Sequence, residues 1–126
     1  MWIVTSFGFF SVVQKPQDAA AGVLTVRARV RRDLEELRAR YLPELGDVVE
    51  SRGTDYRYRG RAPRAAVAEA LRRATLDVRY DNFKDEVDAA QGSARHEASL
   101  GVWGDLLALQ REEQMMWRPA RGGRGG

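Results

Sequence analysis

The sequence predicts an α+β fold in which helices pack on one face of a three- or four-stranded antiparallel sheet, a ferredoxin-like type of sandwich. Three observations support this class. The first thirteen residues are almost entirely apolar, with many β-branched and aromatic side chains. Residues 23–30 and 54–61 alternate in the manner of half-buried strands. The segments that follow them have the apolar spacing of amphipathic helices, which can cover one face of a sheet.

The opening run, residues 1–13, is the most apolar stretch of the chain, and the first charged side chain after it is Lys15. Such a run is typical of a central or near-central strand that is covered on at least one face. Gly8 is expected to form a bulge or a sharp turn within it. We therefore expect the side chains of this run, including Trp2, to belong to the core.

Two further strands are predicted from period-two alternation, at residues 23–30 and 54–61. In the first of them, apolar residues such as Leu24 and Val26 occupy one face. In the second, Tyr56 and Tyr58 share one face. The opposite faces carry five arginines, which are Arg27, Arg29, Arg57, Arg59 and Arg61. These strands are therefore expected to bury one side and to expose a basic side.

Helices are predicted at four places. The first covers about residues 32–41, and Pro63 is placed to open the second. Asp81 or Asn82 is a suitable N-cap for the third, because both side chains can accept a hydrogen bond from a backbone N–H of the first turn. The fourth covers about residues 94–114.

The last helix defines the expected domain organisation. Leu100 and Trp103 fall on one of its faces, which we expect to be buried. Residues 1–114 are accordingly expected to form a single α+β domain. Residues 115–126 are rich in arginine and glycine and end in two Arg-Gly-Gly units, so this tail is expected to be disordered.

Composition excludes several classes of protein. The 126 residues include no cysteine, so disulfides and thiolate metal sites are excluded. No signal peptide and no membrane-spanning run is evident, and the cytoplasm is the expected location without a membrane partner. The net charge is +3, and Lys15 and Lys84 are the only lysines among 21 basic residues. Arginine binds phosphate and carboxylate through two parallel hydrogen bonds, although a GC-rich genome also favours arginine.

Four segments of the sequence carry a resemblance. These are the runs Thr5-Ser6-Phe7-Gly8-Phe9-Phe10-Ser11-Val12-Val13, Val26-Arg27-Ala28-Arg29, Thr54-Asp55-Tyr56-Arg57-Tyr58-Arg59 and Tyr80-Asp81-Asn82-Phe83-Lys84. Together with the Met-Trp start and Val102-Trp103, they resemble a family of small uncharacterised bacterial proteins. The resemblance covers roughly residues 1–110, and it implies no activity, cofactor or site residue.

The leading functional hypothesis is a small non-catalytic domain that binds an anionic partner, in the first place RNA or single-stranded nucleic acid. The five arginines would supply the positive sheet face, and Phe7 and Phe9 resemble the stacking aromatics of RNA-recognition sheets. The alternative is that these phenylalanines belong to the core and that the arginines form a solvated face paired with acids on the helices. A protein-interaction or homodimerisation module is the second functional hypothesis.

A metal-dependent nuclease is the third hypothesis. Asp81, Asp85 and Asp88 have a spacing that could hold Mg²⁺, but acids at a helix N-terminus are also expected from capping alone. His96 is the only histidine, and no nucleophile pattern accompanies it. We therefore expect no catalytic residue, no metal site and no cofactor.

Overall fold

The computed structural model describes the backbone of residues 1–123 and the side chains of residues 1–116. The chain separates into two compact units, Met1–Asp81 and Asn82–Gly126, called unit 1 and unit 2 below. A boundary therefore falls inside the range 1–114 for which the sequence suggested one domain. That assignment stays a prediction, as does disorder over residues 115–126, of which residues 124–126 lie outside the described part.

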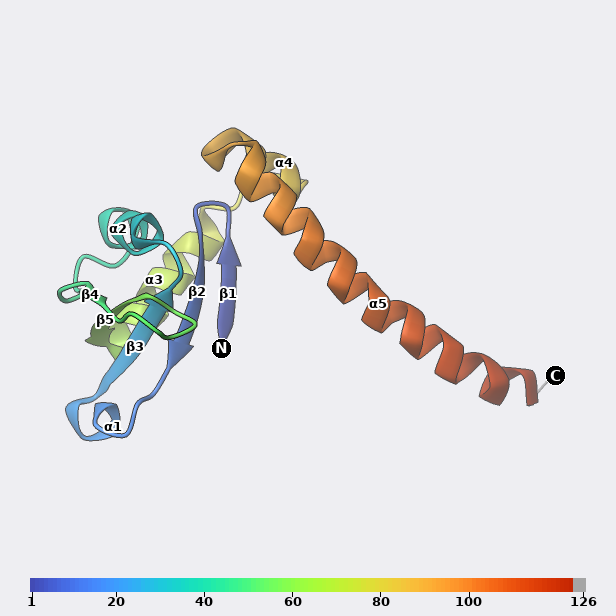
Figure 1. The fold of residues 1–126 in the computed structure, drawn as a ribbon, viewed down its shortest axis with the longest axis horizontal. Coiled ribbons are helices and arrows are strands. Elements are labelled where there is room, and N and C mark those ends of the chain that lie inside the picture. Colours follow the sequence, from blue (N-terminus) through green and yellow to red (C-terminus); the bar gives the residue numbers. More distant parts are fainter. Residues whose placement is uncertain (124–126) are drawn as a thin grey trace. The chain divides into compact units, whose positions relative to one another are not determined.

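Unit 1 contains a five-stranded antiparallel sheet with the strand order β1-β2-β3-β5-β4. The strands are β1 (Trp2–Thr5), β2 (Gly8–Val13), β3 (Val23–Ala28), β4 (Val49–Glu50) and β5 (Tyr58–Pro63). Figure 1 shows the strands side by side, with α2 (Arg31–Arg40) and α3 (Arg64–Leu76) packed against them. The predicted α+β class with an antiparallel sheet is confirmed, and the sheet has more strands than the expected three or four.

The additional strand at the N-terminus arises because the opening run folds back on itself. Thr5 and Gly8 are opposite each other in the β1–β2 hairpin. The Thr5 hydroxyl accepts a hydrogen bond from the Gly8 N–H at 3.0 Å and donates one to the Gly8 carbonyl at 3.0 Å. Gly8 was thus correctly expected at a turn. Its lack of a side chain is required by packing, since a Cβ atom there would lie 2.6 Å from the ring of Phe10.

The hydrophobic core lies between one face of the sheet and the two helices α2 and α3. Phe10 and Val26 are almost completely buried in it, and Leu34 of α2 and Val67 of α3 cover them from the helix side. These residues follow the predicted alternation along the strands and the predicted apolar lines along the helices. The core therefore occupies one face of the sheet and leaves the opposite face to polar side chains.

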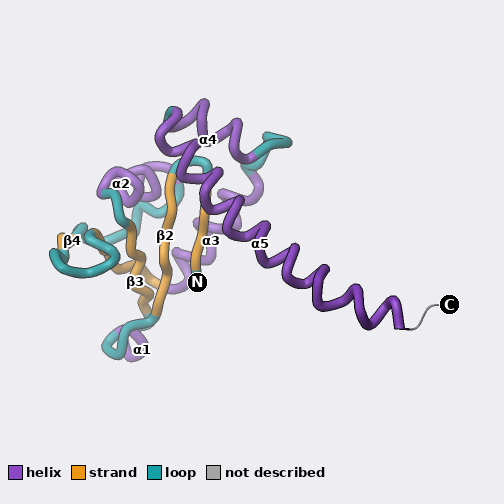
Figure 2. The backbone as a smooth tube through the Cα atoms, turned by 45° about the vertical axis from the view of Figure 1, so that its right-hand side comes forward, coloured by secondary structure: helices purple, strands orange, loops and turns teal. Residues whose placement is uncertain are grey.

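A short helix, α1 (Asp18–Ala21), connects β2 to β3. Gly22 ends it in the left-handed conformation at φ 67°, which a glycine adopts without steric cost. Figure 2 shows α1 at one end of the sheet, next to the start of β3. This position brings the buried side chain of Asp18 to the strands.

Unit 2 consists of α4 (Phe83–Gln91) and α5 (Ser93–Gly123), which pack against each other. Asn82 is the N-cap of α4, as expected, and its side chain accepts a hydrogen bond from the Asp85 N–H at 3.1 Å. Three expectations about the core were wrong. Trp2 is 67% exposed, Trp103 is 53% exposed and Leu100 is 39% exposed, so none of these side chains is buried.

No helix in the described part of the chain is both long enough and apolar enough to span a lipid bilayer.

Candidate anion-binding surface

The side of the sheet that faces away from α2 and α3, called the outer face below, carries most of the predicted arginines. The strand register places Arg27 of β3 directly opposite Arg59 of β5, and Thr25 directly opposite Arg61. Opposed residues of an antiparallel pair share one face of the sheet. The register therefore brings three of the five predicted side chains onto one surface, as the alternation in the sequence predicted.

Arg61 is neutralised by a carboxylate. Its Nη2 atom lies 2.6 Å from Oδ1 of Asp18, which is completely buried. The other carboxylate oxygen of Asp18 accepts hydrogen bonds from the Thr25 hydroxyl at 2.7 Å and the Lys15 N–H at 2.8 Å. Burial raises the pKa of Asp18, but the bonds from Thr25, Lys15 and Arg61 outweigh it, so that the pKa lies below its ordinary value. The ion pair between Arg61 and Asp18 thus attaches α1 to strand β5 of the sheet.

Arg57 is also neutralised. It lies just before β5 and forms an ion pair of 2.6 Å with Glu50 of β4. The hydrogen bond from Arg57 lowers the pKa of Glu50 below its ordinary value, and the same bond raises the pKa of Arg57. This arginine therefore binds the edge strand β4.

The remaining three arginines all contact Tyr56, through its ring or its backbone carbonyl, and are called the arginine cluster: Arg27, Arg29 and Arg59. The guanidinium carbons of Arg27 and Arg29 lie 4.5 and 4.3 Å from the ring centroid of Tyr56. Arg59 donates a hydrogen bond of 3.2 Å to the Tyr56 carbonyl, and Arg27 donates one of 2.7 Å to the Ser11 hydroxyl. Cation–π contacts of this kind each contribute on the order of 0.5–2 kcal/mol.

The position of Tyr56 differs from the sequence prediction, which placed it beside Tyr58 and opposite the arginines. Residues 51–57 form a loop, and β5 begins only at Tyr58. The loop turns the Tyr56 ring toward Arg27 and Arg29, where it is 6% exposed. Tyr58 packs against the core as predicted. The predicted strand over residues 54–61 was therefore wrong in its first half. There the backbone forms a loop, which no hydrogen bonds to a neighbouring strand hold in an extended conformation.

The arginine cluster is short of hydrogen-bond and charge partners. Among residues 1–116, whose side chains the structure describes, the ion pairs include none to Arg27, Arg29 or Arg59. The Nε atoms of Arg27 and Arg59 are buried and have no hydrogen-bond partner there. Like charges opposed across a strand pair are destabilising, and an unsatisfied buried donor costs about 1–3 kcal/mol. An anion at this place would offset the repulsion between the like charges.

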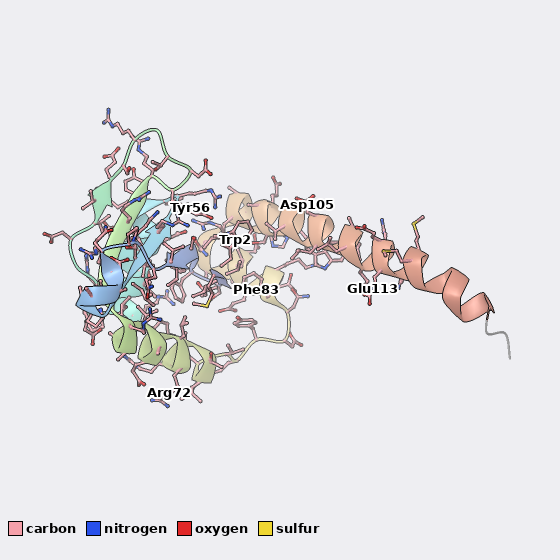
Figure 3. The ribbon with its side chains drawn as sticks, turned by 90° about the horizontal axis from the view of Figure 1, so that it is seen from below. Trp2, Tyr56, Arg72, Phe83, Asp105 and Glu113 are labelled. Atoms are coloured by element: carbon pink, nitrogen blue, oxygen red, sulfur yellow. The ribbon has the colours of Figure 1, made fainter. Side chains whose placement is uncertain are left out.

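Two aromatic side chains extend the surface away from the arginine cluster. Trp2 of β1 is opposite Ser11, and its indole meets the ring of Phe9 in an edge-on contact at 5.3 Å. The guanidinium carbon of Arg29 lies 5.6 Å from the centroid of Phe9. Figure 3 labels Trp2 and Tyr56 among the side chains of unit 1.

Sequence reasoning missed Trp2 as a surface residue. Its neighbour Ile3 packs against the core, and the period of two then places Trp2 on the outer face. The alternation of Trp2 and Ile3 was present in the sequence. It did not predict which of the two is exposed, because both faces of an uninterrupted apolar run are apolar. Among the phenylalanines of the run, Phe7 is core rather than a stacking residue, and Phe9 is on the outer face.

The other candidate residues do not assemble into a site. The side chains of residues 1–116 contain no group of three or more metal-ligating residues that could hold an ion. Asp81, Asp85 and Asp88 are all exposed: Asp81 precedes α4, Asp85 lies in its first turn and Asp88 lies in its second half. His96 holds the α4–α5 pair together, since its Nδ1 atom lies 2.7 Å from the Lys84 carbonyl.

Comparisons of the chain with protein-family models, with curated proteins and with solved structures give no match.

Proposed function

We propose that unit 1 binds single-stranded nucleic acid, RNA in the first place, on the outer face of its sheet. The observation that carries this proposal is the division among the five arginines. Arg57 and Arg61 each have a carboxylate partner, whereas the three members of the arginine cluster meet aromatic rings, hydroxyls and carbonyls instead. Three unneutralised guanidinium groups on one surface favour a ligand that carries several negative charges.

The chemistry of phosphate suits this cluster. Guanidinium groups bind phosphate oxygens through two parallel hydrogen bonds, and the phosphates of one strand repeat along the chain. A phosphate that bridges Arg27 and Arg59 would reduce the repulsion between these opposed side chains. A single small anion would satisfy only part of the cluster, so a polyanion is the better fit.

The aromatic side chains favour a single strand over a duplex. Trp2 is exposed on the same face, and Phe9 lies beside it. Unpaired bases can stack on such rings, at about 1–3 kcal/mol per base, whereas the bases of a duplex are already stacked on one another. The combination of a basic cluster with a neighbouring aromatic pair is typical of sheets that bind single strands.

Fluorescence anisotropy with a labelled single-stranded RNA, the DNA of the same sequence and the matching duplex tests the proposal. We expect single strands to bind more tightly than the duplex. If the three cluster arginines contact phosphates, the logarithm of the affinity should fall with the logarithm of the salt concentration with a slope of roughly −2. Absence of binding at low salt, or preference for the duplex, would contradict the proposal.

A matched pair of double variants separates this surface from net charge. Arg27→Gln with Arg59→Gln removes two charges from the cluster and should abolish most of the binding. Arg72→Gln with Arg79→Gln removes two charges elsewhere, where the arginines face Glu69 and Asp77, and should leave binding intact. Figure 3 shows Arg72 and Tyr56 on opposite sides of unit 1. Equal losses in the two variants would show that binding depends on overall charge and not on the outer face.

A further inference from the structure

The longest helix of the chain, α5, carries an apolar stripe that the other helix of unit 2, α4, leaves exposed. Val102, Leu106, Leu109 and Met116 of α5 are all exposed, and Leu106 and Leu109 are about 60% exposed. These four residues are spaced four, three and seven residues apart. Glu113 divides the last interval, since it lies four residues after Leu109 and three before Met116. This is the spacing by which one helix packs along another.

The stripe is not the part of α5 that α4 engages. Two residues of α5 contact Lys84 of α4. His96 forms a hydrogen bond with the Lys84 carbonyl, and the centroid of the Trp103 ring lies 4.5 Å from the Lys84 ammonium. At about 100° per residue, His96 and Trp103 lie on a line roughly 60–80° around the helix from Leu106. The apolar stripe therefore runs beside the α4 contact and extends past it toward the C-terminus.

We propose that the stripe pairs with the stripe of a second copy of this chain in an antiparallel, two-fold symmetric helix pair. The argument for this occupant is charge complementarity. Arg95 lies seven residues before Val102, and Glu113 lies seven residues after Leu106. Residues seven apart lie on the same side of a helix, so Arg95 and Glu113 are at the two ends of the stripe. In the antiparallel register that sets Val102 opposite Leu106 of the other copy, Arg95 comes opposite Glu113.

This register is compatible with a two-fold axis, because each contact occurs twice. Val102 meets Leu106 of the second copy on one side of the axis, and Leu106 meets Val102 on the other side, so the same patch serves both chains. Leu109 then faces Ser99, whose small side chain leaves room for it. The two ends of the stripe carry opposite charges, Arg95 and Glu113. An antiparallel pair sets them together, whereas a parallel pair would set each against its like.

The oligomeric state of the full chain tests the pairing, independently of nucleic-acid binding. Sedimentation of the nucleic-acid-free protein should give twice the chain mass of 14.2 kDa at tens of micromolar. Leu106→Glu with Leu109→Glu should give the single mass. Met115→Glu is the matched control, because Met115 is exposed but lies nine residues from Leu106, which is the opposite side of the helix. A monomeric wild-type protein, or a dimer in all three proteins, would overturn the proposal.

The direction of the pair can be measured because the chain has no cysteine. Val102→Cys protein mixed with Leu106→Cys protein and oxidised should form mainly the mixed disulfide. Disulfides that join only like chains would show a parallel pair and would refute the antiparallel register. Glu113→Arg should weaken the dimer at least tenfold, and Arg95→Glu in the same chain should restore it. Failure of that restoration would contradict the proposed pairing of the ends.

Discussion

On the core face of the sheet, β2, β3 and β5 contribute Phe10, Val26 and Ala62, and the helices α2 and α3 cover them. On the outer face, the same strands contribute Phe9, Arg27 and Arg59, and the ion pairs among residues 1–116 include none to the arginine cluster. Both faces result from one alternation along each strand. The difference is that helices of the same unit cover the core face, whereas the arginine cluster on the outer face has no ion pair among the described side chains.

The largest effect is expected on the core face. Phe10→Ala should lower the free energy of unfolding of unit 1 by about 3–5 kcal/mol, because the ring is 2% exposed and its removal leaves a cavity. Urea denaturation followed by far-ultraviolet circular dichroism measures this change. Phe9→Ala, on the neighbouring residue of the same strand, is the control and should cost less than half as much. Similar losses for the two variants would mean that the two faces are equally packed.

The second effect concerns Asp18, whose buried carboxylate contacts Thr25 and Arg61 of the outer face. The pKa of Asp18 is lowered from its ordinary value of 3.8, so the folded state is stabilised by ionised Asp18 above about pH 4. This stabilisation is lost as the pH falls below 3.8 through the lowered pKa of the folded state. Asp18→Asn should therefore have a lower melting temperature than the wild type at pH 7, with a smaller difference at pH 2–3.

Thermal melting of both proteins from pH 7 to pH 2 tests the role of Asp18. Other carboxylates, such as Glu50 and Glu69, also have lowered pKa values and contribute to acid sensitivity in both proteins. The difference between the two melting curves isolates Asp18. A difference that does not change with pH would show that the carboxylate charge is unimportant for attaching α1.

The third effect distinguishes binding from stability on the outer face. Trp2→Ala should weaken single-strand binding by about 1–3 kcal/mol, the loss expected for one stacked base. Its effect on the melting temperature should be small, since the indole is largely exposed. Trp2→Phe keeps a flat ring and should retain most of the affinity. Unchanged binding by Trp2→Ala would remove the aromatic pair from the proposed surface.

The smallest effect is expected in unit 2. Asn82→Ala removes the side-chain cap of α4 and should destabilise that helix by about 1 kcal/mol. Amide hydrogen exchange in the first turn of α4 measures this change, and it should rise without a change in nucleic-acid binding. Loss of binding in this variant would show that the outer face of unit 1 does not act alone.

Much of the fold could be predicted from local patterns. The alternation of residues 23–30 correctly assigned Arg27 to the face opposite Val26, because a strand turns successive side chains to opposite sides. The N-cap at Asn82 was likewise expected, since the asparagine side chain satisfies an N–H group of the first turn. In both cases the physical cause acts between residues that are close in the sequence.

In the opening run and in α5, local sequence patterns did not predict correctly which side chains are buried. Trp2 and Trp103 were both expected to be buried, and both are exposed. An apolar pattern states that a side chain favours burial, but only the arrangement of distant elements decides whether anything covers it. The hairpin leaves Trp2 on the uncovered face of an edge strand, and α4 is too short to cover α5.

By itself, the sequence determined the class of fold, the alternation that separates apolar from basic sides, and the absence of cysteine chemistry. Only the tertiary structure decided which arginines are neutralised. Asp18 meets Arg61 across 43 residues of chain, while the loop before β5 brings Tyr56 to Arg27 and Arg29. These contacts depend on the strand register and on a loop conformation. Both follow from packing the whole unit, so no pattern within a single segment contains them.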